Sequence, residues 1–138
     1  MISNQGRADL LVRALRSRVL GGGEAGDLFT EDVKVWTPTF SARSLADLTA
    51  ETSVFEAAFS DVDLDVRPLD VGGDYACAEW VLWATHSGPF PSREEAGAQP
   101  TGRRVRLVGV TVAEFDDDRI CSLRHYWDEL MLVQQLGA

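Results

Sequence analysis

The spacing of apolar residues divides the chain into a helical N-terminal part and a later part made of strands. Apolar residues recur every three or four positions from Ala8 to Val19, which predicts a helix that ends at the glycines 21–23. Ser44 stands directly before a second run with this spacing and is a predicted helix N-cap. After the first helix we therefore expect a short helix, a short strand and a longer helix at 24–29, 33–36 and 44–59.

The period changes to two after residue 60. Val62, Leu64 and Val66 alternate with aspartates, which predicts a strand with one solvated face. Three longer strands are expected after it, separated by turn signals and one polar loop, at 75–87, 103–115 and 119–127. Helices followed by antiparallel strands favour an α+β fold, in which a strongly curved sheet wraps over the helices and leaves a cavity between them.

Length and composition predict a single domain over residues 1–138. The chain has 138 residues, of which 45% are hydrophobic, and this is enough for one core. Its 13 basic and 22 acidic residues give a net charge of -9, which argues against nucleic acid and anionic membranes as partners. Because the chain has two cysteines, charged residues throughout its first twenty positions and no apolar run of bilayer length, we expect a cytoplasmic protein.

Three apparent ligand motifs fail on their spacing. The letters G-x-G-x-x-G at 21–26 follow a helix instead of a strand, so they form no dinucleotide site. The aspartates of 61–65 resemble the start of a calcium loop, but Val66 and Gly72 stand where that loop needs glycine and glutamate. Zinc needs three or four convergent ligands, and the chain offers only two cysteines and two histidines. We therefore expect neither a metal nor a cofactor.

Asp128 is the first candidate for chemistry. It follows two aromatic residues, Tyr126 and Trp127, and precedes an apolar run. Desolvation in such surroundings raises the pKa of a carboxyl group, which can then take and give a proton near neutral pH. The alternative is that Asp128 is the N-cap of a helix, because aspartate at the start of an apolar run often has that role.

His86 is the second candidate. It ends a predicted strand and is followed by Gly88-Pro89 and a long loop, where the mouth of a pocket is expected. An imidazole there can exchange a proton or donate a hydrogen bond to a developing oxyanion. The alternative is a surface histidine that caps the strand.

Several blocks in the second half of the chain together resemble one family. These blocks are Thr85–Pro89, Pro100–Arg103, Val112–Ile120, Tyr126–Asp128 and Gln135–Gly137. In order and spacing they are similar to the SnoaL-like polyketide cyclases of the nuclear transport factor 2 superfamily, over about residues 29–137. The three aspartates at 116–118 depart from the family, which usually has a glycine in that turn.

The resemblance implies a fold, a reaction and two site residues. The fold is a cone-shaped α+β domain in which a curved, mostly antiparallel sheet and N-terminal helices enclose a deep hydrophobic pocket, commonly as a homodimer or homotetramer. The reaction is a cofactor-free intramolecular aldol closure of a polyketide ring. The family's general acid/base matches Asp128, and its histidine matches His86. The expected ligand is a bulky apolar or polycyclic carbonyl compound.

Five aromatic residues are the expected walls of this pocket: Trp36, Phe55, Phe59, Trp80 and Tyr126. Ordinary core or subunit-interface roles are the alternative for each tryptophan. Arg124 is an expected substrate contact, but on a regular strand it shares a face with Tyr126 and Asp128. If Arg124 paired with Asp128, the pKa of that acid would fall and the pair would be structural.

Two other functions remain open at this stage. The same fold could carry an isomerase or an epoxide hydrolase, for which Arg124 with Glu79 or Glu114 could supply the carboxylates and the arginine. It could also be a module that binds a small molecule without catalysis, since function depends on the site and not on the fold.

Overall fold

A computed structural model describes residues 3–20, 25–69, 71–89 and 100–137, without the side chains of 18–20, 25–26 and 51–56. Four helices are present in these ranges: α1 (Asn4–Leu20), α2 (Ala25–Leu28), α3 (Leu45–Ala58) and α4 (Glu129–Gln135). The strands are β1 (Phe29–Trp36), β2 (Ser41–Ala42), β3 (Phe59–Leu69), β4 (Tyr75–His86), β5 (Arg104–Asp116) and β6 (Arg119–Trp127).

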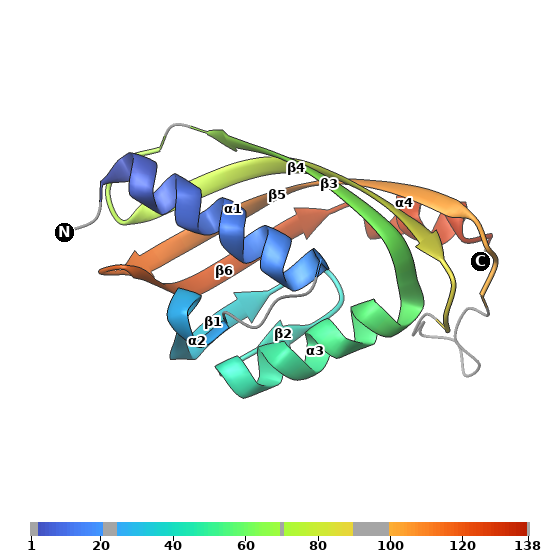
Figure 1. Ribbon diagram of the computed structural model, residues 1–138, viewed down its shortest axis with the longest axis horizontal. Coiled ribbons are helices and arrows are strands. Elements are labelled where there is room, and N and C mark those ends of the chain that lie inside the picture. The colour runs from blue at the N-terminus through green and yellow to red at the C-terminus, as the bar shows by residue number, and fades with distance from the viewer. Residues whose placement is uncertain (1–2, 21–24, 70, 90–99, 138) are drawn as a thin grey trace.

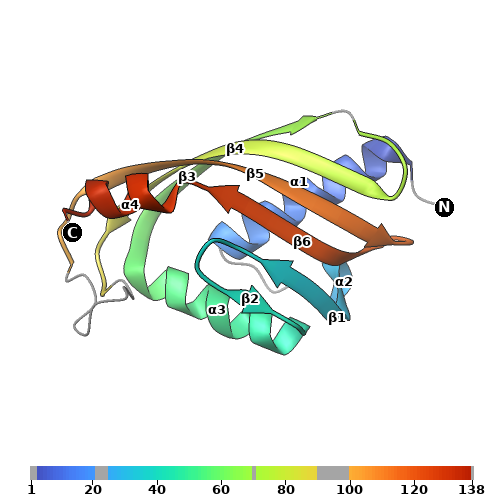
Figure 2. The ribbon, with the colours of Figure 1, turned by 180° about the vertical axis from the view of Figure 1, so that it is seen from behind.

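The strands form one six-stranded sheet in the order β2-β1-β6-β5-β4-β3. All neighbouring strands are antiparallel except β1 and β6, which run parallel. The sheet is strongly curved, and α1 and α3 lie on the same side of it (Figure 1). Seen from behind, α4 lies at the end of the molecule where β6 finishes (Figure 2). The predicted α+β fold with a curved, mostly antiparallel sheet is confirmed.

Alternation along the central strands decides which side chains face the helices. Every second residue of β4 from Ala76 to His86 is buried, and the buried residues of β5 alternate in the same way from Val105 to Phe115. We call the face that carries these buried residues the inner face of the sheet. Alanines at three of the inner β4 positions leave room for α1, which packs across β3 and β4. The inner face therefore carries the core.

The element boundaries differ from the sequence prediction mainly at turns. Ser44 is an N-cap as predicted, since its Oγ accepts a hydrogen bond of 3.2 Å from the backbone N–H of Asp47. Phe59 was expected on the third helix but begins β3, and the short strand β2 was not predicted. Most of the predicted loop 88–102 lies outside the described residues. In the part of the chain that the structure describes, no helix is both long and apolar enough to cross a membrane.

Candidate active site

The end of β6 presents two residue sets to opposite faces of the sheet. His125 is buried, with 4% of its surface exposed, and Trp127 is half-buried on the same inner face. Arg124 and Tyr126 are exposed on the outer face. The predicted shared face of Arg124 and Tyr126 is confirmed, and the structure shows that the inner face is the one with His125.

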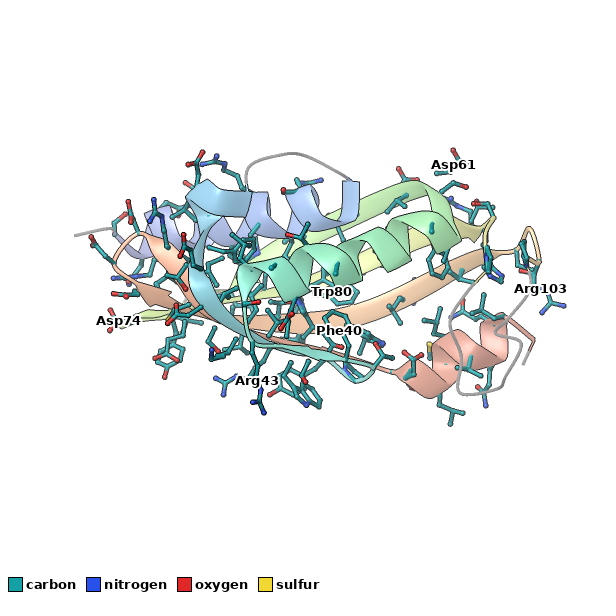
Figure 3. All side chains as sticks on the ribbon, turned by 90° about the horizontal axis from the view of Figure 1, so that it is seen from below. Phe40, Arg43, Asp61, Asp74, Trp80 and Arg103 are labelled. Carbon is teal, nitrogen blue, oxygen red and sulfur yellow. The ribbon has the colours of Figure 1, made fainter. Side chains whose placement is uncertain are left out.

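His125 is part of a buried polar chain across three strands. Its Nδ1 lies 2.7 Å from Oγ1 of Thr111, the residue directly opposite on β5. The indole Nε1–H of Trp80, on β4, donates a hydrogen bond of 2.9 Å to the same Oγ1. All three side chains are buried, and Trp80 lies in the layer between α3 and the sheet (Figure 3). Neutral hydrogen bonds of this kind hold the imidazole in one orientation.

Two indoles border this polar chain. The ring of Trp127 lies with its centroid 6.4 Å from that of Trp80, at an interplanar angle of 60°. The same Trp127 ring lies 6.4 Å from the His125 ring. Tryptophan supplies a large apolar surface together with one N–H group. The imidazole thus lies beside large apolar rings on the inner face.

Glu129 is a half-buried carboxyl group at the start of α4. Its Oε2 accepts a hydrogen bond of 2.7 Å from Nε1 of Trp127. Burial raises the pKa of Glu129 above its ordinary value, and the Trp127 hydrogen bond opposes that shift only in part. Such an environment was predicted for Asp128, whereas the carboxyl group that has it is that of the next residue, Glu129.

Asp128 is an exposed helix N-cap. Its backbone is extended, and its Oδ1 accepts a hydrogen bond of 3.0 Å from the backbone N–H of Met131 in the first turn of α4. The expected desolvated environment is therefore wrong for Asp128, because the chain leaves the sheet at this residue and turns its carboxylate to solvent and to the helix start. The N-cap alternative is confirmed. Whether Asp128 also transfers a proton stays a prediction.

His86 is fully buried and is hydrogen-bonded to the segment before β5. Its Nδ1 lies 3.0 Å from Oγ1 of Thr101 and accepts a hydrogen bond of 3.2 Å from the Thr101 backbone N–H. The main chain is tied at the same place, since His86 N–H donates to the carbonyl of Arg103 and its own carbonyl accepts from Gly102. A backbone N–H only donates, so Nδ1 carries no proton. His86 thus has a clear structural contact, whereas its contact with substrate stays a prediction.

The five predicted pocket walls divide between the two faces. Phe59 and Trp80 are buried, and Phe59 packs 5.7 Å from the His86 ring. Trp36 and Tyr126 are each 46% exposed and pack against one another on the outer face at 5.3 Å. They occupy outward positions of β1 and β6 and not the inner face, and their part as pocket walls stays a prediction. The side chain of Phe55 lies outside the described residues.

Arg124 does not pair with the acids considered for it. It is exposed on the outer face, and no ion pair joins it to any described residue. Glu79 instead pairs with Arg67 of β3. The predicted contact of Arg124 with an inner-face substrate is not supported by this position, since the strand separates the two faces.

A separate cleft of about 270 Å³ lies between the start of α1 and the β3–β4 hairpin. The residues that line it are Asn4, Gln5, Ala8, Pro68, Leu69, Val71, Tyr75 and Ala76. The hairpin residue Asp74 and the α4-side residue Arg103 mark opposite ends of the molecule (Figure 3). Of the predicted site residues whose side chains the structure describes, none lines this cleft. The residues that the structure describes contain no cluster of three metal-binding side chains.

His125, Thr111 and Glu129 were missed from the sequence. The signal for His125 was present, because charged Arg124 on the neighbouring position favours solvent and so assigns His125 to the interior. Glu129 had no comparable signal. Its contact with Trp127 depends on the turn between β6 and α4, which residue spacing does not determine.

Comparisons with known proteins agree with the fold. A family model described as SnoaL-like polyketide cyclase matches residues 22–136. A proposed SnoaL-like polyketide cyclase from Jannaschia sp. CCS1 is similar in structure, with a TM-score of 0.84, 18% identity and coverage of 97% of this chain and 93% of that one. IdmH, a proposed polyketide cyclase from Streptomyces antibioticus, has a TM-score of 0.77 at 22% identity, covering 96% and 99%.

AclR, a proposed hydroxylase from Streptomyces galilaeus, has a TM-score of 0.79 at 23% identity and covers 98% of both chains. No protein of curated function is significantly similar to the chain in sequence. At these identities the solved structures establish the fold alone. The reaction therefore has to be inferred from the side chains.

Proposed function

Since the chain belongs to the SnoaL-like polyketide cyclase family, we propose that it closes a ring in a polyketide or similar bulky carbonyl compound by an aldol reaction, without a cofactor. The substrate lies against the inner face of the sheet. His125 polarises the carbonyl group that is attacked, and Glu129 carries the proton that moves during the reaction. A flat apolar substrate packs on Trp80 and Trp127.

The proposed reaction balances with these two groups. The Glu129 carboxylate removes a proton from the carbon beside one carbonyl group. The resulting enolate carbon attacks a second carbonyl carbon of the same molecule, and a carbon–carbon bond forms. The new alkoxide then takes the proton back from the Glu129 carboxyl group. His125 donates a hydrogen bond to the oxygen on which negative charge develops.

The position of His125 is the observation that carries this proposal. It is a buried imidazole on the inner face, it is held by Thr111, and it lies beside the Trp127 ring. Hydrogen-bond donors are most effective when they are fixed in advance in surroundings of low polarity. The raised pKa of Glu129 supports its part, because a carboxyl group with a pKa nearer to neutrality can both take and return a proton.

The fold alone does not select this reaction. The structurally similar AclR is described as a proposed hydroxylase, whereas a related protein from Agrobacterium tumefaciens is described as a proposed isomerase of the SnoaL-like family. An isomerase would use the same first proton transfer and form no carbon–carbon bond. An epoxide hydrolase built on Arg124 has less support, because Arg124 lies on the outer face.

Three variants test the proposal with a panel of linear aromatic poly-β-ketones, whose ring closure is followed by absorbance and mass. H125N keeps an acceptor for Thr111 but removes the imidazole, and we expect kcat to fall by about 10²–10³-fold. E129Q replaces the carboxyl group that takes and returns the proton, and we expect kcat to fall by about 10²–10⁴-fold. D128N keeps the N-cap of α4 and distinguishes the two adjacent acids.

We expect D128N to retain kcat within about threefold, because neutral asparagine caps a helix as well as aspartate does. If D128N lost activity as strongly as E129Q is expected to, Asp128 would be the acid/base and the assignment to Glu129 would be wrong. Full activity of H125N would show that His125 does not polarise the carbonyl group. Binding of the ketones without any turnover by the wild-type protein would favour the non-catalytic alternative.

A further inference from the structure

We propose that Thr111 and Trp80 are positioning residues that fix the neutral tautomer of His125 with its proton on Nε2. The inference rests on the proposed function for its effect on turnover, whereas the proton position itself can be measured without substrate. It explains how a buried imidazole can act as a hydrogen-bond donor to a carbonyl oxygen.

The direction of donation between Trp80 and Thr111 is fixed by the indole. An indole N–H can donate and cannot accept, so Oγ1 of Thr111 accepts from Trp80 at 2.9 Å. The threonine hydroxyl then has one hydrogen left to donate. His125 Nδ1 lies 2.7 Å from the same oxygen, which is a hydrogen-bonding distance for either direction of donation.

Burial of Thr111 decides the second step. Its side chain has no exposed surface, and its other hydrogen-bond neighbour among the described residues is the Trp80 donor. If His125 donated from Nδ1, the threonine hydrogen would have no acceptor among these residues, and a buried unsatisfied donor is strongly disfavoured. The hydroxyl therefore donates to Nδ1. In a neutral imidazole the proton is then on Nε2.

Gly109 gives the indole of Trp80 access to Thr111. Gly109 is the residue of β5 directly opposite Trp80, and Thr111 lies two positions further along the same face. A Cβ atom on Gly109 would overlap Cζ2 and Cη2 of the Trp80 ring. The indole thus lies across a position without a side chain and reaches the hydroxyl beyond it. This arrangement fixes the donor that orients Thr111.

With the proton on Nε2, His125 and Glu129 have different parts in catalysis. His125 with a proton on Nε2 stabilises negative charge on the substrate oxygen by donating a hydrogen bond, and no proton has to leave the ring. Proton movement is left to Glu129. The opposite tautomer would present a lone pair to the oxygen and repel it.

Nitrogen-15 NMR of the histidine rings tests the proton position, because protonated and unprotonated ring nitrogens differ widely in chemical shift. The probe is the substrate-free protein with ¹⁵N-labelled histidine, and H125N assigns the signals. We expect one neutral His125 tautomer, protonated at Nε2, in the wild type and in T111S, which keeps the hydroxyl. We expect T111V, which removes it, to give a mixture of tautomers and to lower kcat by about tenfold or more with little change in KM.

W80F is a second variant in case T111V fails to fold. It keeps an aromatic ring but removes the donor to Thr111, so we expect the share of the Nδ1-protonated tautomer to increase. Protonation of Nδ1 in the wild type, or an unchanged tautomer in a folded T111V, would overturn the inference. An active H125N together with the expected tautomer would instead refute the proposed function and leave the positioning of the ring intact.

Discussion

The N-cap role of Asp128 leads to a stability prediction that separates it from a buried acid. In D128A the backbone N–H of Met131 loses its acceptor, and the carboxylate no longer faces the positive end of α4. Loss of an N-cap side chain costs about 1 kcal/mol, with a range of about 0.5–2 kcal/mol. Loss of the charge at the helix start contributes about 0.3–1 kcal/mol at an exposed site.

Other contacts of α4 should hold the helix in place when its N-cap is lost, so that only the first turn is affected. Leu132 is buried, and Gln135 exchanges two hydrogen bonds of 2.8 Å with the backbone of Arg106 on β5. We therefore expect D128A to lower the free energy of unfolding by about 1–2 kcal/mol. For a chain of this length that corresponds to a decrease in Tm of about 3–7 °C. Urea unfolding and differential scanning calorimetry at pH 7 measure both quantities.

D128N is the matched control for this experiment. Asparagine caps a helix about as well as aspartate, so we expect D128N to lose only the charge contribution and to melt close to the wild type. An unchanged Tm in D128A would refute the cap. A gain in stability for D128N would point to a desolvated carboxylate, since removing a buried charge is favourable.

The other predictions concern the contact of His86 with Thr101, the titration of Glu129, and the outer face of the sheet. H86A should lower the free energy of unfolding by about 2 kcal/mol or more, because Thr101 loses its buried acceptor; an unchanged urea midpoint would contradict this. Burial raises the folded-state pKa of Glu129, so the folded protein binds the proton more tightly and the contribution of Glu129 to stability falls as pH rises from the unfolded to the folded pKa. Urea titrations across that range should show this pH dependence weakened in E129Q, and an identical slope would contradict it. A double W36S/Y126S variant should shift an expected homodimer towards monomer in sedimentation, because both rings are 46% exposed on the outer face; a monomeric wild type would remove the prediction.

The sequence predicted the faces of β6 correctly but not which face is the inside. Period-two alternation placed His125 and Trp127 on one side and Arg124 and Tyr126 on the other, as the structure shows. Each side carries one aromatic residue, so hydrophobicity alone did not decide between them. The charge of Arg124 was the better guide, since charged side chains are almost never fully buried unless they are paired.

Asp128 was misjudged for a different physical reason. Alternation holds only while the chain stays extended, and β6 ends at Trp127, one residue before Asp128. Beyond that point the direction of a side chain depends on the turn into α4. The cap at Asp128 and the contact between Trp127 and Glu129 are both products of that turn. Two adjacent acids therefore have opposite environments that their sequence context does not distinguish.

The parallel pairing of β1 with β6 has a consequence for how the protein is made. Residues of β1 such as Val35 and Trp36 pair with Leu123 and Arg124, which the ribosome adds almost ninety residues later. Until then β1 has, among the strands that the structure describes, only the two-residue β2 beside it. Such long-range closure slows folding and leaves an unpaired strand edge exposed during synthesis. The nascent chain is thus most prone to aggregation just before its last strand emerges, and this is the stage at which a chaperone has the most to protect.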